Sequence, residues 1–328
     1  MLFGGGALIR DGSQLKATFD FHDGAKGWQG SFSAPALRAL RVPLARVSFA
    51  PPRVHFELVG DFETTLFDGG LSGDQLSGSF REGKAPGTFR LDRSKLPAAK
   101  YREENIRFSN GAVELAGTLL LPLTPGPHPA VLFLHGSGPE GRFGGRFLAE
   151  YSVKHGIAAL IYDKRGVGQS TGDWRTSGFQ ELAGDARAGL KWLSTRPEIR
   201  PHQIGIYGHS QGGSLAPLIA TQSPEVAFVV SAAGAGVPMW ESEIYSLTEQ
   251  TRAQGVNGKD LEEAQEFIRL TIHVGEDRAR TGTSWRRRKH GRSRPAGPGT
   301  SSCPPEATAG GRTFGKSRTT TQPTPGNG

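Results

Sequence analysis

The chain has 328 residues, enough for about two domains, and its 36% hydrophobic and 9% aromatic content is ordinary for a globular protein. No apolar run reaches the ~20 residues that span a membrane, and a single cysteine, Cys303, excludes an intrachain disulfide and a cysteine-rich metal site. The net charge of +8 comes from residues 277–328, which carry 11 Lys/Arg against 2 Asp/Glu, whereas residues 1–276 carry a net −1. The charge therefore does not indicate nucleic-acid binding by residues 1–276.

Residues 1–95 are predicted to form an all-β domain, a small antiparallel barrel or sandwich. Short strand candidates alternate there with turn dipeptides such as Asp11-Gly12 and Glu82-Gly83. We expect a structural accessory domain, with an internal ligand pocket as the alternative. The first residues resemble the middle of a hairpin and lack the features of a signal peptide. We therefore expect an upstream segment to be missing, and a cytoplasmic location is the default assignment, with export left open.

Residues 96–274 are predicted to form an α/β domain that lacks its last strands. A hairpin across Asn110-Gly111, a strong type I′ turn signal, follows the linker 96–104. Buried strands then alternate with helices, which favours a mostly parallel sheet with helices on both faces. The strands are expected at 130–134, 157–162, 203–207 and 226–232, and the helices at 143–155, 179–196 and 214–221. Two amphipathic helices, about 240–253 and 259–272, are interpreted as a cap over the active site.

Residues 275–328 are predicted to be a disordered basic tail. They contain no Leu, Ile, Val, Met or Tyr, so they cannot bury enough apolar surface to offset the entropy of ordering. The abrupt change to Gly, Pro, Arg and Thr favours a shift of reading frame near residue 275. A genuine solvated extension is one alternative, and a localisation signal or nucleic-acid arm built on residues 286–294 is the other.

The chemistry is expected to centre on the G-x-S-x-G run Gly208-His209-Ser210-Gln211-Gly212, which follows an apolar strand and opens a helix. A serine on such a turn projects its hydroxyl above the sheet, and the crowded turn needs small residues two positions before and after it. Ser210 is therefore the candidate nucleophile. The free N–H of Gln211, at the helix N-terminus, can stabilise a developing oxyanion.

A second oxyanion donor is expected in the loop His135-Gly136-Ser137-Gly138-Pro139, after the first parallel strand. The N–H of Ser137 is the first choice and that of Gly138 the second. Such donors typically contribute ~3 kcal/mol each.

The same loop also fits a different function, because Gly136, Gly138 and Gly141 form G-x-G-x-x-G and Asp163 ends the next strand. That layout is typical of dinucleotide-binding oxidoreductases. Pro139 removes an N–H that a pyrophosphate needs, and Glu140 places a negative charge beside it. The dinucleotide interpretation also leaves the run around Ser210 unexplained.

Four further polar residues near these loops are interpreted as structural. Asp163 and Arg165 could act as catalytic carboxylate and substrate clamp, but we expect a hydrogen-bonded turn that shapes the site floor. His135 and His209 lie on the same turns as the oxyanion donors, so neither ring can easily face the Ser210 hydroxyl. We expect both to support the turns.

Together, the 135–139 loop, the run Asp163-x-Arg165-Gly166-x-Gly168-x-Ser170 and residues 208–213 resemble the α/β-hydrolase superfamily. The resemblance is to bacterial serine carboxylesterases with an N-terminal β domain, and it covers residues 105–272. It implies a serine hydrolase for carboxylic esters, with a small-molecule ester as substrate and neither metal nor organic cofactor. Thioesterases and serine peptidases of the same fold share these motifs and remain alternatives.

The chain departs from that family after Ser210, where an acid and then a histidine should each follow a strand. Only Asp260, Asp277, His273 and His290 remain there, and neither histidine follows a strand. The catalytic acid and base are therefore unassigned, and we expect little activity. A non-catalytic acyl-ligand binding protein is the alternative of another class. The oligomeric state is left open.

Overall fold

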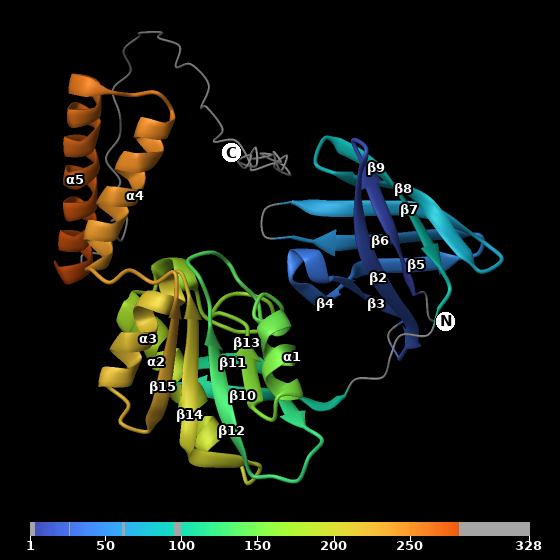
Figure 1. Cartoon of the computed structure of the whole chain (residues 1–328), viewed down its shortest axis with the longest axis horizontal. Coiled ribbons are helices and arrows are strands. Elements are labelled where there is room, and N and C mark those ends of the chain that lie inside the picture. The colour runs from blue at the N-terminus through green and yellow to red at the C-terminus, as the bar shows by residue number, and fades with distance from the viewer. Residues whose placement is uncertain (1–3, 26, 61–62, 95–99, 282–328) are drawn as a thin grey trace, which may run out of the picture. The chain divides into compact units, whose positions relative to one another are not determined.

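A computed structural model describes residues 4–25, 27–60, 63–94 and 100–281, with the side chains of 273–281 left out. Two sheets organise these residues, one of nine antiparallel strands and one of six mostly parallel strands (Figure 1). The second carries helices on both faces. The predicted order, an all-β part followed by an α/β part, is confirmed.

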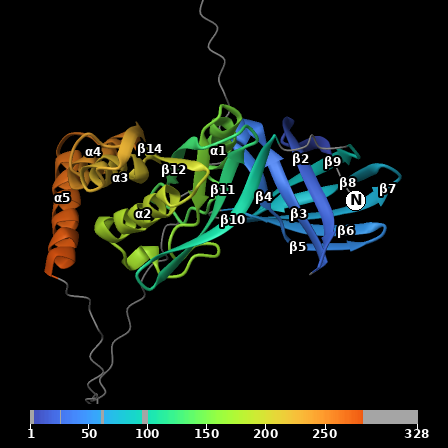
Figure 2. The same cartoon turned by 90° about the horizontal axis from the view of Figure 1, so that it is seen from below.

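The first sheet curls into a nearly closed barrel in which β3 also contacts β5 (Figure 2). Its strands, in sheet order, are β4 (Ala39–Pro43), β3 (Gly27–Ala34), β2 (Ser13–Gly24), β1 (Gly5–Arg10), β9 (Ala85–Asp92), β8 (Gln75–Glu82), β7 (Thr64–Ser72), β6 (Arg53–Val59) and β5 (Ala45–Ala50). The sequence did not predict β4. That strand contains Arg41, which has a positive φ of 51°, and it carries little of the usual alternating pattern.

Aromatic side chains fill the barrel. On β2, for example, Ala17, Phe19 and Phe21 alternate with more exposed residues and point inward. Phe56 and Phe67 stack with ring centroids 4.6 Å apart, and other phenyl rings pack around them. Such pairs contribute about 0.5–1.5 kcal/mol beyond the area they bury. Phenyl rings therefore occupy the interior of the barrel.

The six-stranded sheet has the order β10-β11-β13-β12-β14-β15. The strands are β10 (Tyr101–Asn110), β11 (Val113–Pro122), β13 (Ala158–Tyr162), β12 (His128–Leu134), β14 (Ile199–His209) and β15 (Val226–Ala232). The β10–β11 hairpin turns at Asn110-Gly111, as predicted, and β11 runs antiparallel to β13. From β13 to β15 every neighbouring pair is parallel.

Helices cover both faces of this sheet, as the alternating pattern predicted. Helix α1 (Arg146–Lys154) packs on β13 and β11, whereas α2 (Phe179–Ser194) and α3 (Gln211–Thr221) pack on the opposite face (Figure 1). Helix α1 begins three residues later than expected, because Gly144 and Gly145 precede it and glycine is a poor helix former.

Two further helices, α4 (Met239–Ala253) and α5 (Gly258–Thr281), pack against each other. Their existence was predicted, but α5 runs nine residues past the expected end at 272. The prediction of disorder is thus wrong for residues 275–281, which are helical. The physical reason is that this stretch contains several strong helix formers: Glu276, Arg278, Ala279 and Arg280. The rest of the predicted tail, 282–328, lies outside the described residues. No helix in the described part is long and apolar enough to cross a membrane.

Candidate active site

Ser210 lies where β14 ends and α3 begins, in a backbone conformation that is rare for any residue except glycine. Its φ is 53° and its ψ is −117°. The Ser210 N–H donates to Ala232 O at 2.9 Å, and the Ser214 N–H donates to Ser210 O at 3.1 Å. Strain of this kind costs about 1–3 kcal/mol and persists only where neighbouring structure imposes it.

Close backbone contacts explain the glycines around Ser210. A Cβ on Gly208 would collide with the carbonyl oxygen of Gly212, and a Cβ on Gly212 would lie 2.6 Å from His135 O. Neither contact can be relieved by a side-chain movement, since the obstructing atoms belong to the backbone. These contacts therefore require glycine at both positions.

We call the strand-to-helix turn at residues 208–212 the elbow. The elbow and the 135–140 loop are neighbours because β12 and β14 are adjacent parallel strands, with Leu134 opposite Gly208. The first hydrogen bond of α3 is that from Ser214 to Ser210, so the Gln211 N–H precedes it and has no acceptor within the helix. The fold thus brings together the three groups that the sequence singled out: Ser210, Gln211 and the loop that contains Ser137.

The 135–140 loop closes on itself in a way that disfavours dinucleotide binding. The Glu140 carboxylate accepts the Gly136 N–H at 2.7 Å, so this amide is not available to a phosphate. Helix α1 does not start at the loop but at Arg146, five residues after Gly141. A pyrophosphate at the glycines would therefore lack the helix N-terminus that such sites use.

His135 is held away from proton transfer by a backbone contact. Its Nε2 lies 2.5 Å from Tyr162 O, and since a carbonyl can only accept, Nε2 carries the proton. Burial lowers the pKa of His135 to about 4, despite the opposing effect of that hydrogen bond. The ring is therefore neutral near pH 7. The His209 side chain, by contrast, is exposed.

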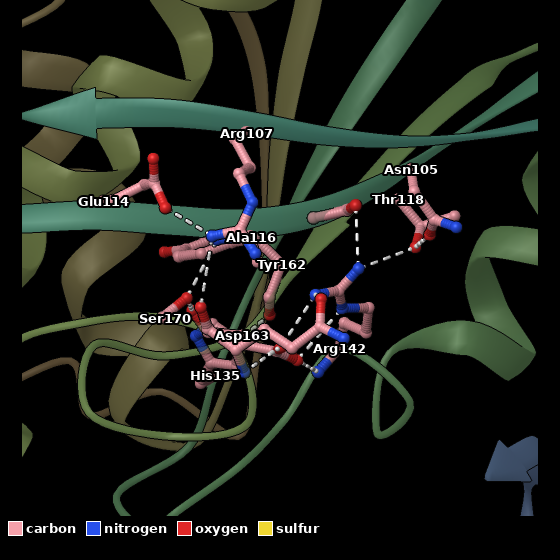
Figure 3. A network of polar contacts seen from close by, with 12 residues as sticks. Asn105, Arg107, Glu114, Ala116, Thr118, His135, Arg142, Tyr162, Asp163 and Ser170 are labelled. Atoms are coloured by element: carbon pink, nitrogen blue, oxygen red, sulfur yellow. Dashed lines mark hydrogen bonds and ion pairs between the residues drawn. The ribbon is translucent and has the colours of Figure 1, made fainter. Parts of the chain in front are cut away.

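The oxygens of the Asp163 carboxylate accept hydrogen bonds from other groups of the protein (Figure 3). The donors are Arg142 Nε at 3.1 Å, Arg142 Nη2 at 2.8 Å, and the N–H groups of Arg142 and Gln169. Burial raises the pKa of Asp163, but the hydrogen bonds outweigh it and hold the pKa below its ordinary value. Ser170 Oγ joins the same turn, donating to Asp163 O and accepting from Ala116 N–H.

Arg165 is engaged just as fully. Its Nε and Nη2 donate to the two carboxylate oxygens of Asp185 on α2, both at 2.6 Å, and its Nη1 donates to Ser177 Oγ at 3.0 Å. Because Nε, Nη1 and Nη2 of Arg165 all donate to groups of the protein, the guanidinium is not available to bind a substrate. These contacts support the structural interpretation of Asp163 and Arg165.

Sequence reasoning missed the contacts of Arg142 and Glu140 and, above all, those of Lys164. Lys164 Nζ donates to Gly136 O at 2.7 Å, to Gly138 O at 3.2 Å and to Gln211 Oε1 at 3.1 Å. Burial lowers the pKa of Lys164, while the Glu140 charge works in the opposite direction. The only available signal was the position of Lys164 between Asp163 and Arg165, since its partners lie 26 to 47 residues away.

No described side chain hydrogen-bonds to Ser210 Oγ, so the catalytic acid and base remain unassigned. His273 belongs to α5, where its side chain is not described, and His290 lies beyond the described range. Over that range no group of three or more His, Cys, Asp or Glu side chains is arranged to hold a metal ion.

Residues 125–271 match the family model Hydrolase_4, described as "Serine aminopeptidase, S33". The match spans β12 to α5 and includes the elbow, the 135–140 loop and the Asp163 turn. This part of the chain has the α/β-hydrolase fold.

The α/β-hydrolase part has low-identity relatives among esterases. It is 34% identical over 140 residues to an uncharacterized protein of Mycobacterium tuberculosis, covering 42% of this chain and 46% of that one. It is 31% identical over 158 residues to Esterase EstD of Thermotoga maritima, covering 44% and 37%. The Pyrococcus furiosus esterase Pf2001 structure aligns with a TM-score of 0.39 at 21% identity, covering 52% and 66%. The chain spans less than half the length of these two curated relatives.

Proposed function

We propose that this α/β-hydrolase is a serine hydrolase that acts on carboxylic esters of small molecules, with Ser210 as the nucleophile. The observation that carries the proposal is the Ser210 backbone, at φ 53° and ψ −117° between a strand and a helix. A non-glycine residue held in a strained conformation needs a reason. Lifting a reactive hydroxyl clear of the sheet supplies one.

In the proposed reaction, Ser210 Oγ forms a bond to the ester carbonyl carbon. The carbonyl oxygen becomes an oxyanion that accepts from the Gln211 and Ser137 N–H groups, each contributing about 3 kcal/mol at the transition state. The tetrahedral intermediate collapses, the alcohol leaves with the serine proton, and the acyl group stays on Ser210. Water then attacks the acyl-enzyme and releases the carboxylic acid.

The rate is expected to be low, because no described group can take the serine proton. Loss of the base of a catalytic triad costs about 10⁶ in kcat, and about 10³ over water remains from the oxyanion hole and binding. We expect slow hydrolysis of p-nitrophenyl butyrate and a butyryl adduct on Ser210, detected by mass spectrometry, that is absent in Ser210→Ala. Ser137→Ala is the matched control, since it keeps the backbone N–H and should keep the activity.

Turnover of the parent chain without any acyl adduct on Ser210 would refute the proposal. Turnover at ordinary enzyme rates, lost in Ser210→Ala, would instead show that an unassigned residue supplies the base.

A peptidase or a thioesterase is the second candidate, since the matching family model is described as a serine aminopeptidase. The two oxyanion donors serve esters, thioesters and amides alike. Comparison of p-nitrophenyl butyrate with butyryl thioesters and aminoacyl p-nitroanilides distinguishes them. The proposal predicts the highest kcat/KM for the oxygen ester.

A further inference from the structure

Lys164 lies two residues after the end of β13 and is almost fully buried, with 3% of its surface exposed. An ammonium group has three donors. All three are used: two on the carbonyls of Gly136 and Gly138, and the third on the Gln211 side chain. The Lys164 N–H also donates to Glu140 O, at 3.3 Å. One residue therefore connects the 135–140 loop to the start of α3.

Peptide geometry gives the Gly136 contact a consequence for Ser137. Gly136 C=O and Ser137 N–H belong to one planar, trans peptide group, in which the two point in opposite directions. Fixing Gly136 O on the ammonium therefore directs the Ser137 N–H away from Lys164. A charge-assisted bond to the carbonyl also polarises the amide, which makes its N–H a stronger donor.

The third contact acts on the other donor. Gln211 Oε1 accepts from Lys164 Nζ at 3.1 Å, so the residue that contributes the second N–H is tied to the same cation. The Trp174 ring lies 5.2 Å from Nζ and favours a positive charge there. The two segments that carry the N–H donors are thus both hydrogen-bonded to the same ammonium group.

We propose that Lys164 is a positioning residue that orients the Ser137 and Gln211 N–H groups as one oxyanion-binding pair. It does not touch the substrate, and it acts through the Gly136 peptide and the Gln211 side chain. This inference rests on the proposed function.

The first test is independent of catalysis: ¹H–¹⁵N amide spectra and amide hydrogen exchange of the full chain. We expect Lys164→Met to shift the Ser137 and Gln211 amide resonances and to change their exchange rates. Lys191→Met, at an exposed lysine on α2, removes the same charge and is the matched control. Unchanged Ser137 and Gln211 amides in folded Lys164→Met would overturn the inference.

A second variant covers the case in which Lys164→Met does not fold. Gln211→Leu keeps the Gln211 N–H and Lys164 but removes the tie between them. We expect a changed exchange rate of the residue-211 amide alone, with the Ser137 amide exchanging as in the parent chain. Equal exchange of the residue-211 amide in both proteins would contradict the proposed role of the Gln211 contact.

Ester turnover then separates positioning from general support. Small displacements of catalytic groups cost up to about 10²-fold, so Lys164→Met should lower kcat about 10-fold to 100-fold and leave KM within about twofold. Lys164→Arg, which keeps the charge in a different shape, should recover part of kcat. Equal loss of kcat in Lys191→Met would overturn the positioning role. Absence of an acyl adduct on Ser210 in the parent chain would refute the proposed function, while the amide spectra would still decide the inference.

Discussion

At the scale of single residues, Ser210 combines strain with a proposed chemical role. Because its φ is 53°, glycine would occupy the position more easily. We predict that Ser210→Gly raises the free energy of unfolding by about 1 kcal/mol, whereas Ser210→Ala, which keeps the strain, does not. Denaturant unfolding of the two variants measures the difference. A Ser210→Gly variant no more stable than Ser210→Ala would show that the elbow is not strained.

The buried pair Arg142–Asp163 predicts a pH dependence. The pKa of Asp163 is lower in the folded protein than in the unfolded chain, so its contribution to stability is present above the unfolded value of about 4 and is lost as the pH falls through the folded pKa. Asp163→Asn should cost about 3–5 kcal/mol near pH 7, since it leaves Arg142 buried without its partner.

The control for this pair is Asp74→Asn, in an exposed pair with Arg93, where 82% of the aspartate side chain is accessible. It should change stability by less than about 1 kcal/mol. Both predictions are checked by measuring the unfolding free energies of Asp163→Asn and Asp74→Asn at several pH values. If the unfolding free energies of the parent chain and Asp163→Asn changed in parallel as the pH falls below 4, the lowered pKa of folded Asp163 would be contradicted.

At the scale of elements, the strand–elbow–helix unit depends on backbone contacts that only glycine permits. Gly208→Ala should destabilise the fold by about 1–3 kcal/mol, because its Cβ would meet the Gly212 carbonyl. Gly236→Ala is the matched control, since a Cβ there meets nothing within 4 Å. Thermal unfolding of both variants decides. Equal melting temperatures would show that the elbow can accommodate a Cβ at residue 208 without loss of stability.

The element scale also shows what could be predicted from the sequence. The nucleophile elbow was readable because its strand, turn and helix are contiguous and its glycines mark the close contacts. The role of Lys164 was not, because it acts on two carbonyls and an amide that only the folded sheet brings to it. Arg142 was missed for the same reason: Asp163 is 21 residues away. Strand β4 carried too little alternation to be recognised.

At the scale of the whole molecule, the six-stranded sheet ends in an exposed strand. Strand β15 is an edge strand, and its Phe228, Val229 and Val230 side chains are 40%, 36% and 45% exposed. Unpaired apolar edges are templates for association. We predict concentration-dependent association that Val230→Lys reduces, measured by light scattering. Gln254→Lys adds the same charge just after α4 and should leave the association unchanged. An equal effect of both substitutions would assign the association to net charge.

The central claim is that Ser210 is the nucleophile, and covalent capture tests it most directly. The full chain, incubated for hours with a fluorophosphonate and mapped by peptide mass spectrometry, should carry one adduct, on Ser210. The adduct should be absent in Ser210→Ala and retained in Ser137→Ala. A folded chain that gives no adduct, or an adduct on another residue that persists in Ser210→Ala, would contradict the claim and favour a protein that binds acyl ligands without reacting with them.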